Sequence, residues 1–187
     1  DDGLQDPSLN YDLSFVCFNN INWIGNGLLI PSGPLREKLK SIDKHDAVFL
    51  NGNEENNSDI ISSIKKINED MRIFETYYRP INISKFDIED NFLIFSGIGS
   101  PNSFKKTLLK YNFKIIKEII FPDHYQYTNK DIEKIKLSAT NLNAKILTTE
   151  KDYIKISQQS LNGINFLEID LVIKKEDELI NFIKSKI

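Results

Sequence analysis

Apolar, β-rich segments alternate along this chain with segments whose apolar residues recur at helical spacing. The predicted strands cover 12–18, 47–50, 72–78, 92–95, 113–121, 145–147 and 166–169. The predicted helices cover 35–42, 58–68, 101–111, 129–142, 150–156 and 176–187. Strands separated by helices of this length pair in parallel through crossover helices. The alternation therefore predicts an α/β protein with layers of helix, mostly parallel sheet and helix.

Two segments interrupt the alternation. Residues 51–57 are rich in asparagine and are typical of a loop, and residues 82–91 read as a linker. We therefore predict two lobes, residues 1–81 and residues 82–187. A length of 187 residues with 40% hydrophobic residues is sufficient for an ordinary globular core.

Charge, cysteine content and the length of apolar runs argue against a nucleic-acid-binding, a disulfide-stabilised or a membrane-spanning protein. The formal net charge of −3 argues against non-specific nucleic-acid binding, which needs clustered positive charge. The single cysteine, Cys17, cannot form an internal disulfide, which fits a reducing cytoplasm. No apolar run approaches the ~20 residues that span a bilayer.

The chain begins with an acidic pair, Asp1 and Asp2, followed by Gly3, Leu4 and Gln5. Paired carboxylates at the end of a strand can hold the hydrated Mg²⁺ that neutralises nucleotide phosphates, although an exposed acidic segment has the same composition. The apolar strand expected before such a pair is absent, and the first residue is not methionine. We therefore expect this chain to be part of a longer protein.

A loop rich in glycine and proline, residues 25–34, precedes the first predicted helix. Asn26 lies in this loop, and Arg36 and Glu37 stand at the predicted helix start. Arginine suits a phosphate, and a carboxylate can support magnesium or orient the arginine. The alternative is a surface loop with a solvated charge pair.

Three further turns follow predicted strands. Residues 97–101 (GIGSP) could present backbone N–H groups to an anion, but the third glycine of a dinucleotide-binding motif is missing. His124, in the FPDH sequence of residues 121–124, can orient a carboxylate or transfer a proton. Lys151, in the TEKD sequence of residues 149–152, is a candidate ligand for a substrate phosphate. The alternatives are a structural turn for residues 97–101, a structural hydrogen bond at the strand exit for His124, and helix capping alone for residues 149–152.

The order and spacing of these motifs resemble the tetraacyldisaccharide 4'-kinases, over most of the chain from residue 1 to about residue 156. GPLRE (residues 33–37) and FPDH are the most specific parts of the resemblance. It implies a P-loop NTPase type of fold in two lobes. It also implies phosphoryl transfer from ATP, with Mg²⁺, to the 4'-hydroxyl of a tetraacyldisaccharide 1-phosphate at the cytoplasmic face of the bacterial inner membrane.

The resemblance also assigns roles to individual residues. Asp1 and Asp2 would serve Mg²⁺-ATP, with Glu37 as a further metal ligand. His124 would pair with a catalytic aspartate upstream of this chain and activate the sugar hydroxyl, and Asp2 would join it in catalysis. The nucleotide- or substrate-binding residues would be Gln5, Asn26, Arg36, Glu37 and Lys151.

The chain departs from the family pattern in three ways. Asp6 stands where a histidine is common, Leu4 replaces an aromatic residue, and no G-x-x-x-x-G-K-[ST] sequence occurs in the 187 residues. Without that loop the β- and γ-phosphates lose their main anchor, so we expect the chain to need an N-terminal P-loop half for activity. Two other readings stay open: a non-catalytic remnant that binds lipid or a partner, and a Rossmann-like sugar-nucleotide protein whose nucleotide meets the turn at residues 97–99.

Overall fold

The computed structural model describes residues 8, 10–52 and 56–186. The chain divides into two compact units. Unit 1 contains the chain up to Arg79 together with the segment from Leu171 onward, and unit 2 is the uninterrupted run Pro80–Asp170. The expected lobe of residues 82–187 is thus wrong for its last 17 residues, which belong to unit 1.

The C-terminal segment belongs to unit 1 because it adds a strand to the sheet of that unit. Its strands are β1 (Phe15–Asn19), β2 (Ala47–Gly52), β3 (Arg72–Pro80) and β8 (Ile169–Ile173), in the order β1-β2-β3-β8. The first three are parallel. Backbone hydrogen bonds join Ile81 to Glu168 and Lys174 to Glu75, so β8 runs against β3. The sequence had predicted a single last strand over 166–169 and missed β8.

Helices α1 (Ser58–Lys65) and α5 (Glu176–Lys186) cover opposite faces of this sheet. Successive residues of a strand point to opposite faces. Val48 accordingly packs in a cluster with Ile64 of α1, while the adjacent Ala47 packs with Leu179 of α5. The burial of α5 against β2 is why the C-terminal segment belongs to unit 1.

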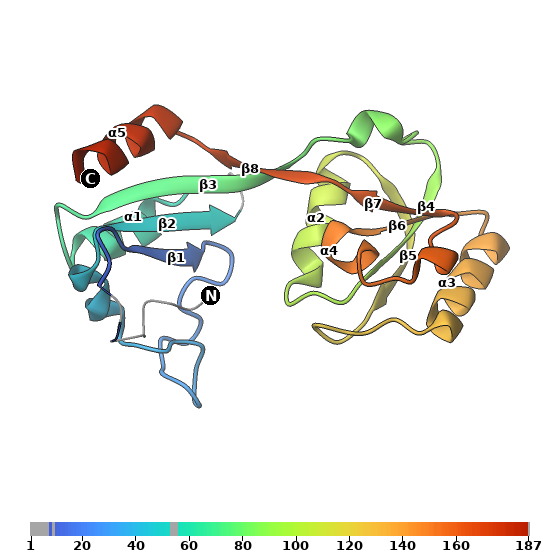
Figure 1. The fold of residues 1–187 in the computed structure, drawn as a ribbon, viewed down its shortest axis with the longest axis horizontal. Helices are drawn as coiled ribbons and strands as arrows, with labels where there is room; N and C mark the ends of the chain where they lie inside the picture. The colour runs from blue at the N-terminus through green and yellow to red at the C-terminus, as the bar shows by residue number, and fades with distance from the viewer. Residues whose placement is uncertain (1–7, 9, 53–55, 187) are drawn as a thin grey trace. The chain divides into compact units, whose positions relative to one another are not determined.

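Unit 2 contains a second four-stranded sheet, in which every pair is parallel (Figure 1). Its strands are β4 (Asn91–Ser96), β5 (Lys114–Ile120), β6 (Lys145–Thr149) and β7 (Ile164–Leu167), in the order β5-β4-β6-β7. The helices are α2 (Pro101–Lys110), α3 (Asn129–Asn141) and the short α4 (Glu150–Tyr153). The predicted alternation of strand and helix is therefore confirmed here, together with the mostly parallel pairing.

The central strand β4 is buried on both faces, because helices lie on both sides of the sheet (Figure 1). Phe92 and Ile94 pack with Phe104 and Leu108 of α2. Leu93 and Phe95 pack on the other face with Ile132 and Ile135 of α3. A strand apolar at consecutive positions is typical of a sheet covered on both faces.

Some element boundaries differ from the sequence predictions. A 3-10 helix, Leu39–Lys44, replaces the helix expected over 35–42. Helix α1 ends at Lys65, three residues before the predicted end at residue 68, and Asn57 is its N-cap. The expected linker 82–91 is part of unit 2: its 3-10 turn, Ile83–Lys85, and Phe86 pack against the Phe92 cluster. A further short 3-10 turn among the described residues is Gln158–Ser160.

The longest of the described helices, α3, has 13 residues. Within residues 8, 10–52 and 56–186, none of the helices has the length and apolar character needed to cross a bilayer.

Candidate functional site

The carboxyl ends of β4, β5 and β6 carry the three turns that the sequence singled out in unit 2. The chain passes from β4 to β5 on one side and then returns to β6 on the other side of β4. In open parallel sheets, ligands bind outside the carboxyl ends of strands at such a reversal. The candidate site of unit 2 is therefore the edge where β4 and β6 end.

His124 lies in a four-residue turn, residues 122–125, which we call the histidine turn. The Tyr125 N–H donates to the Pro122 carbonyl at 3.2 Å and closes the turn. His124 has φ +59°, a left-handed conformation that is uncommon for residues other than glycine. Its side chain is 75% exposed, and its Nε2 lies 3.9 Å from Asp123 Oδ2. The turn therefore presents the imidazole outward, beside a carboxylate.

The glycine turn, residues 97–99, lies directly against the histidine turn. A Cβ added to Gly97 would stand 2.9 Å from the Tyr127 hydroxyl and 3.1 Å from the Pro122 carbonyl oxygen. A Cβ on Gly99 would stand 3.1 Å from Asp123 Oδ2. The space in front of Gly97 is thus filled by protein, whereas a dinucleotide-binding glycine leaves that space for pyrophosphate. This geometry disfavours the Rossmann-like reading.

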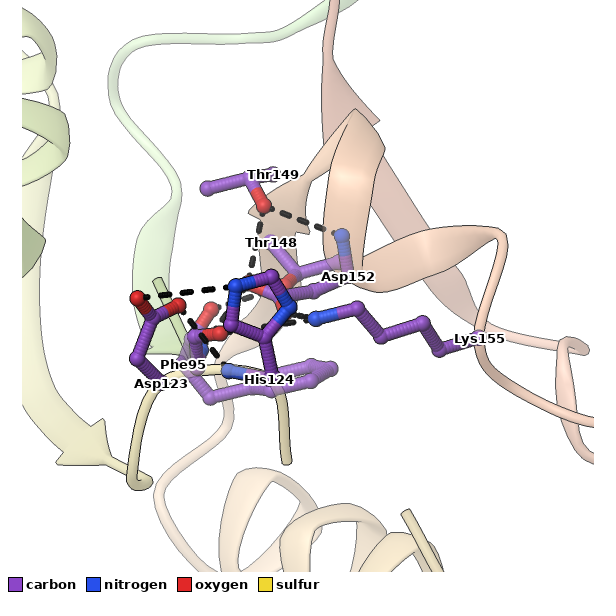
Figure 2. A network of polar contacts seen from close by, with 8 residues as sticks. Phe95, Asp123, His124, Thr148, Thr149, Asp152 and Lys155 are labelled. Atoms are coloured by element: carbon purple, nitrogen blue, oxygen red, sulfur yellow. Dashed lines mark hydrogen bonds and ion pairs between the residues drawn. The ribbon is translucent and has the colours of Figure 1, made fainter. Parts of the chain in front are cut away.

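A buried carboxylate lies behind the glycine turn. Asp152 of α4 is fully buried, and its Oδ2 accepts hydrogen bonds from the Gly97 N–H at 2.9 Å and the Thr149 hydroxyl at 2.8 Å. Its Oδ1 accepts from Lys155 Nζ at 3.1 Å. Figure 2 shows these side chains together with Asp123 and His124. The network joins the start of α4 to the end of β4.

Tyr127 also borders this network. Its hydroxyl is buried and meets no described partner at hydrogen-bonding geometry. Burial, followed by the negative charge of Asp152, raises the pKa of Tyr127 far above its usual value. The phenol therefore stays neutral, and its ring packs on Phe95 of β4 with 5.4 Å between centroids.

The other residues predicted for the site lie in unit 1 or outside the described residues. Asp1, Asp2 and Gln5 fall outside the described residues. The Asn26 side chain holds its own loop, because Nδ2 donates to the Ser32 carbonyl at 2.8 Å and Oδ1 accepts from the Leu28 N–H at 3.1 Å. This contact gives Asn26 a structural task.

Arg36 and Glu37 are exposed. They precede the 3-10 helix that begins at Leu39, so the expectation that they start a helix is wrong. The loop before them is closed by backbone hydrogen bonds between Ile30 and Leu35 at 2.8 Å and between Leu35 and Leu28 at 3.2 Å. The loop is thus held together by backbone contacts, with its two charged side chains directed to its exposed surface.

Lys151 is exposed on α4, and the lysine of the buried network is Lys155. Lys155 was not among the residues predicted for the site, and Asp152 was interpreted only as part of the first turn of a helix capped by Thr149. Thr149 does cap α4, since its Oγ1 accepts from the Asp152 N–H at 3.1 Å. One sequence pattern could have pointed to Lys155. It is the spacing Thr149-x-x-Asp152-x-x-Lys155 directly after the buried strand β6.

Unit 1 has a polar cluster of its own at the start of α1. Asn57 is 6% exposed, accepts from Asn20 Nδ2 at 2.8 Å and donates to Glu75 Oε1 at 2.6 Å. Burial opposes the charge of Glu75, but hydrogen bonds from Asn57 and Lys174 outweigh it and lower the Glu75 pKa. A cleft of about 620 Å³ borders these residues. An asparagine-rich loop over residues 51–57 was the one sequence feature that pointed to this region.

Metal centres in proteins are built from clustered acidic, histidine and cysteine side chains. In the part of the chain that the structure describes, no three of them come together as a metal site would require. The acidic pair proposed for Mg²⁺ stands in the segment that is not described.

Comparisons with known proteins give one consistent family. The profile of the LpxK family, described as tetraacyldisaccharide-1-P 4'-kinase, matches residues 1–187. A tetraacyldisaccharide 4'-kinase of Pelagibacter ubique is 47% identical over 181 residues, which are 97% of this chain and 58% of that protein. One of Rickettsia bellii is 38% identical over 161 residues, covering 86% of this chain and 48% of the relative. The chain thus spans about half the length of these relatives.

A solved structure has the same fold. The crystal structure of LpxK from Aquifex aeolicus, described as an "apo" form in complex with ATP, aligns with a TM-score of 0.63 and 23% identity. The alignment covers 99% of this chain and 56% of that one.

Proposed function

Because this chain belongs to the tetraacyldisaccharide 4'-kinase family, we propose that it is part of an ATP-dependent kinase of lipid A biosynthesis. The reaction would transfer the γ-phosphoryl group of ATP to the 4'-hydroxyl of tetraacyldisaccharide 1-phosphate and give lipid IVA. The observation that carries the proposal is the family match over all 187 residues, which includes the histidine turn. The chain's own half of the reaction would lie at the edge where β4 and β6 end.

His124 is the residue of this chain that we assign to the chemistry. Its imidazole is largely exposed at the tip of the histidine turn, so it is accessible to a group contributed by the rest of the protein. An imidazole there can hold a carboxylate that removes the proton of the attacking hydroxyl. The carboxylate would be an aspartate upstream of this chain. Asp2 would assist the same step from the acidic pair.

Nucleotide binding would draw on both the acidic pair and the loop of unit 1. Asp1, Asp2 and Glu37 would hold Mg²⁺, which supplies charge neutralisation at the phosphates. Gln5, Asn26 and Arg36 would bind nucleotide or substrate, and Lys151 would approach a substrate phosphate. Arg36 and Glu37 are exposed and side by side in sequence, as a phosphate-binding fork with an orienting carboxylate requires. A P-loop must come from the complementary part of the protein, because these 187 residues contain none.

The acylated substrate gives the expected location. A disaccharide with four acyl chains stays in a bilayer, so the enzyme would work as a peripheral protein at the cytoplasmic face of the bacterial inner membrane. Nucleic acid is not an expected partner, given the formal net charge of −3.

A phosphorylation assay with Mg²⁺-ATP and tetraacyldisaccharide 1-phosphate tests the proposal. The samples are the 187-residue chain, its fusion to the complementary part of the Pelagibacter ubique relative, and that fusion carrying His124→Ala. His45→Ala is the matched control, since His45 is the only other histidine and lies in unit 1.

We expect no turnover by the chain alone, turnover by the fusion and by His45→Ala, and a loss of about 100-fold or more in His124→Ala, within the range for a proton-transfer group. An inactive fusion that folds would favour the non-catalytic remnant. Full activity in His124→Ala would remove His124 from the chemistry.

A further inference from the structure

Asp152 is fully buried, whereas a residue in the first turn of a helix can make its capping hydrogen bonds at the surface. The chain contains the same local motif twice, as Thr128-x-x-Asp131 before α3 and Thr149-x-x-Asp152 before α4. Asp131 makes its capping bonds at the exposed surface, with Thr128 at 2.6 Å. Asp152 makes the equivalent bond at 0% exposure. Burying a carboxylate is costly unless it is paired and fully hydrogen-bonded, so the second copy has a role beyond capping.

That role is visible in the long-range partner of Asp152. Its Oδ2 accepts the N–H of Gly97, 55 residues away in the sequence. Lys155, whose side chain is 14% exposed, bonds Asp152 Oδ1 at 3.1 Å and also reaches the Gly97 carbonyl at 3.4 Å. The ion pair therefore holds Gly97 at both of its backbone polar groups. Figure 2 shows the contact between Asp152 and Lys155.

Gly97 in turn supports the histidine turn. The positions nearest a hypothetical Gly97 Cβ are the Tyr127 hydroxyl, the Pro122 carbonyl and, at 3.2 Å, Tyr125 Cβ. One residue earlier, the Ser96 carbonyl accepts the Phe121 N–H at 2.8 Å. A shift of the Gly97 backbone would therefore move both ends of the histidine turn.

The histidine turn needs such support. His124 is in the left-handed region, and Asp123 Oδ1 accepts the His124 N–H at 2.9 Å. A residue other than glycine stays in a sparsely populated conformation only where its surroundings over-determine it. Most of the turn is exposed, so the contact with Gly97 is a main source of that constraint.

We propose that Asp152 is a positioning residue: with Lys155 it clamps Gly97, and Gly97 seats the turn that presents His124. The role of Asp152 in catalysis rests on the proposed function. Its effect on the conformation of the histidine turn is independent of that function. In the described part of the chain the side-chain partners of Asp152 are Gly97, Thr149 and Lys155 rather than His124, so it acts on His124 through the glycine turn.

The link is tested in the 187-residue chain by ¹H–¹³C NMR of the histidine rings. The chain has two histidines, so the His124 and His45 signals are assigned by substituting each in turn. Asp152→Asn is compared with Thr148→Val. Thr148 is also fully buried and one strand position before Thr149, but its hydroxyl bonds the Phe95 carbonyl at 2.7 Å.

We expect Asp152→Asn to shift or split the His124 ring signal and the Gly97 and Gly99 amides, and to leave His45 unchanged. Thr148→Val should leave the His124 signal as in the wild type. A folded Asp152→Asn with an unchanged His124 signal overturns the proposal. If Asp152→Asn does not fold, Lys155→Gln weakens the same clamp more mildly, and an unchanged His124 signal in that variant overturns it equally.

Catalytic relevance is tested in the active fusion. Asp152→Asn should lower kcat by about 10- to 100-fold, as expected for a catalytic group displaced by about 1 Å, with KM for ATP within about 2-fold. Thr148→Val should keep kcat within about 2-fold. Wild-type kcat in Asp152→Asn overturns the positioning role. An inactive wild-type fusion refutes the proposed function instead, and the NMR comparison then decides the link by itself.

Discussion

Gly97→Ala should destabilise unit 2 although alanine is compatible with its backbone. The new Cβ would contact the Tyr127 hydroxyl, the Pro122 carbonyl oxygen and Tyr125 Cβ at 2.9, 3.1 and 3.2 Å. The last two belong to the backbone or the first side-chain atom of the histidine turn, so the turn itself must move. Overpacking of this kind costs about 1–3 kcal/mol. A gain of about 0.4–1 kcal/mol from the stiffer unfolded chain offsets only part of this cost.

Gly99→Ala is the matched control. Its Cβ would meet a single close group, the Asp123 carboxylate, which is 45% exposed and can swing away. We therefore expect Gly99→Ala to lie within about 0.5 kcal/mol of the wild type or to be slightly stabilising. The two variants carry the same chemical change, so their difference isolates the contact with the histidine turn.

Urea unfolding of the 187-residue chain measures the difference. Far-UV circular dichroism follows both units, and the single tryptophan, Trp23, follows unit 1. For a urea m value of about 1–3 kcal/mol/M, Gly97→Ala should lower the midpoint of unit 2 by on the order of 1 M. The Trp23 midpoint should not change. Equal midpoints for Gly97→Ala and Gly99→Ala would refute the close packing of the two turns.

Two further predictions concern stability. The hydrogen bond from the Ser14 N–H, followed by that from Lys186, lowers the pKa of Asp46. The contribution of Asp46 to the stability of unit 1 is therefore complete above the unfolded-state pKa of this carboxyl and is lost as the pH falls through its folded-state pKa. Asp46→Asn should therefore flatten the acid limb of unit 1 stability, measured by Trp23 fluorescence in urea between about pH 6 and pH 3; an unaltered acid limb would contradict this. Thr128→Ala should cost unit 2 about 1 kcal/mol, because Thr128 Oγ1 accepts the Asp131 N–H at the start of α3. Thr140→Ala is its control, as the Thr140 hydroxyl bonds only the Lys136 carbonyl of the same helix, and equal losses in urea unfolding would disprove the capping role.

The strands and helices of unit 2 were predictable because their signals are local. Pro101 at the first position of α2 and the apolar run of β4 each indicate one structure. β8 was missed because three of its five residues are exposed and the other two are only partly buried, and because its pairing with β3 depends on contacts far away in the sequence. The domain boundary was misplaced for the same reason.

The candidate site was predictable in part. His124 stood out because histidine is rare in this chain and follows a strand. Asp152 did not, because a Thr-x-x-Asp motif indicates a helix cap, and only the fold reveals that one copy is exposed and the other is buried against Gly97. Lys151 and Lys155 could not be ranked from sequence, since which face of a short helix is buried depends on its neighbours.

The interruption of unit 1 by unit 2 has a consequence for synthesis on the ribosome. Unit 2 is one continuous segment and is complete once Asp170 has emerged. Unit 1 must wait for β8 and α5, which follow unit 2 in the chain, and until then Phe15, Phe49 and Phe74 lack the Phe182 ring of their cluster. Strands β1 to β3 are therefore translated before unit 2 but are covered only after unit 2 is complete. During that interval an aromatic sheet face is open to chaperones or to other nascent chains.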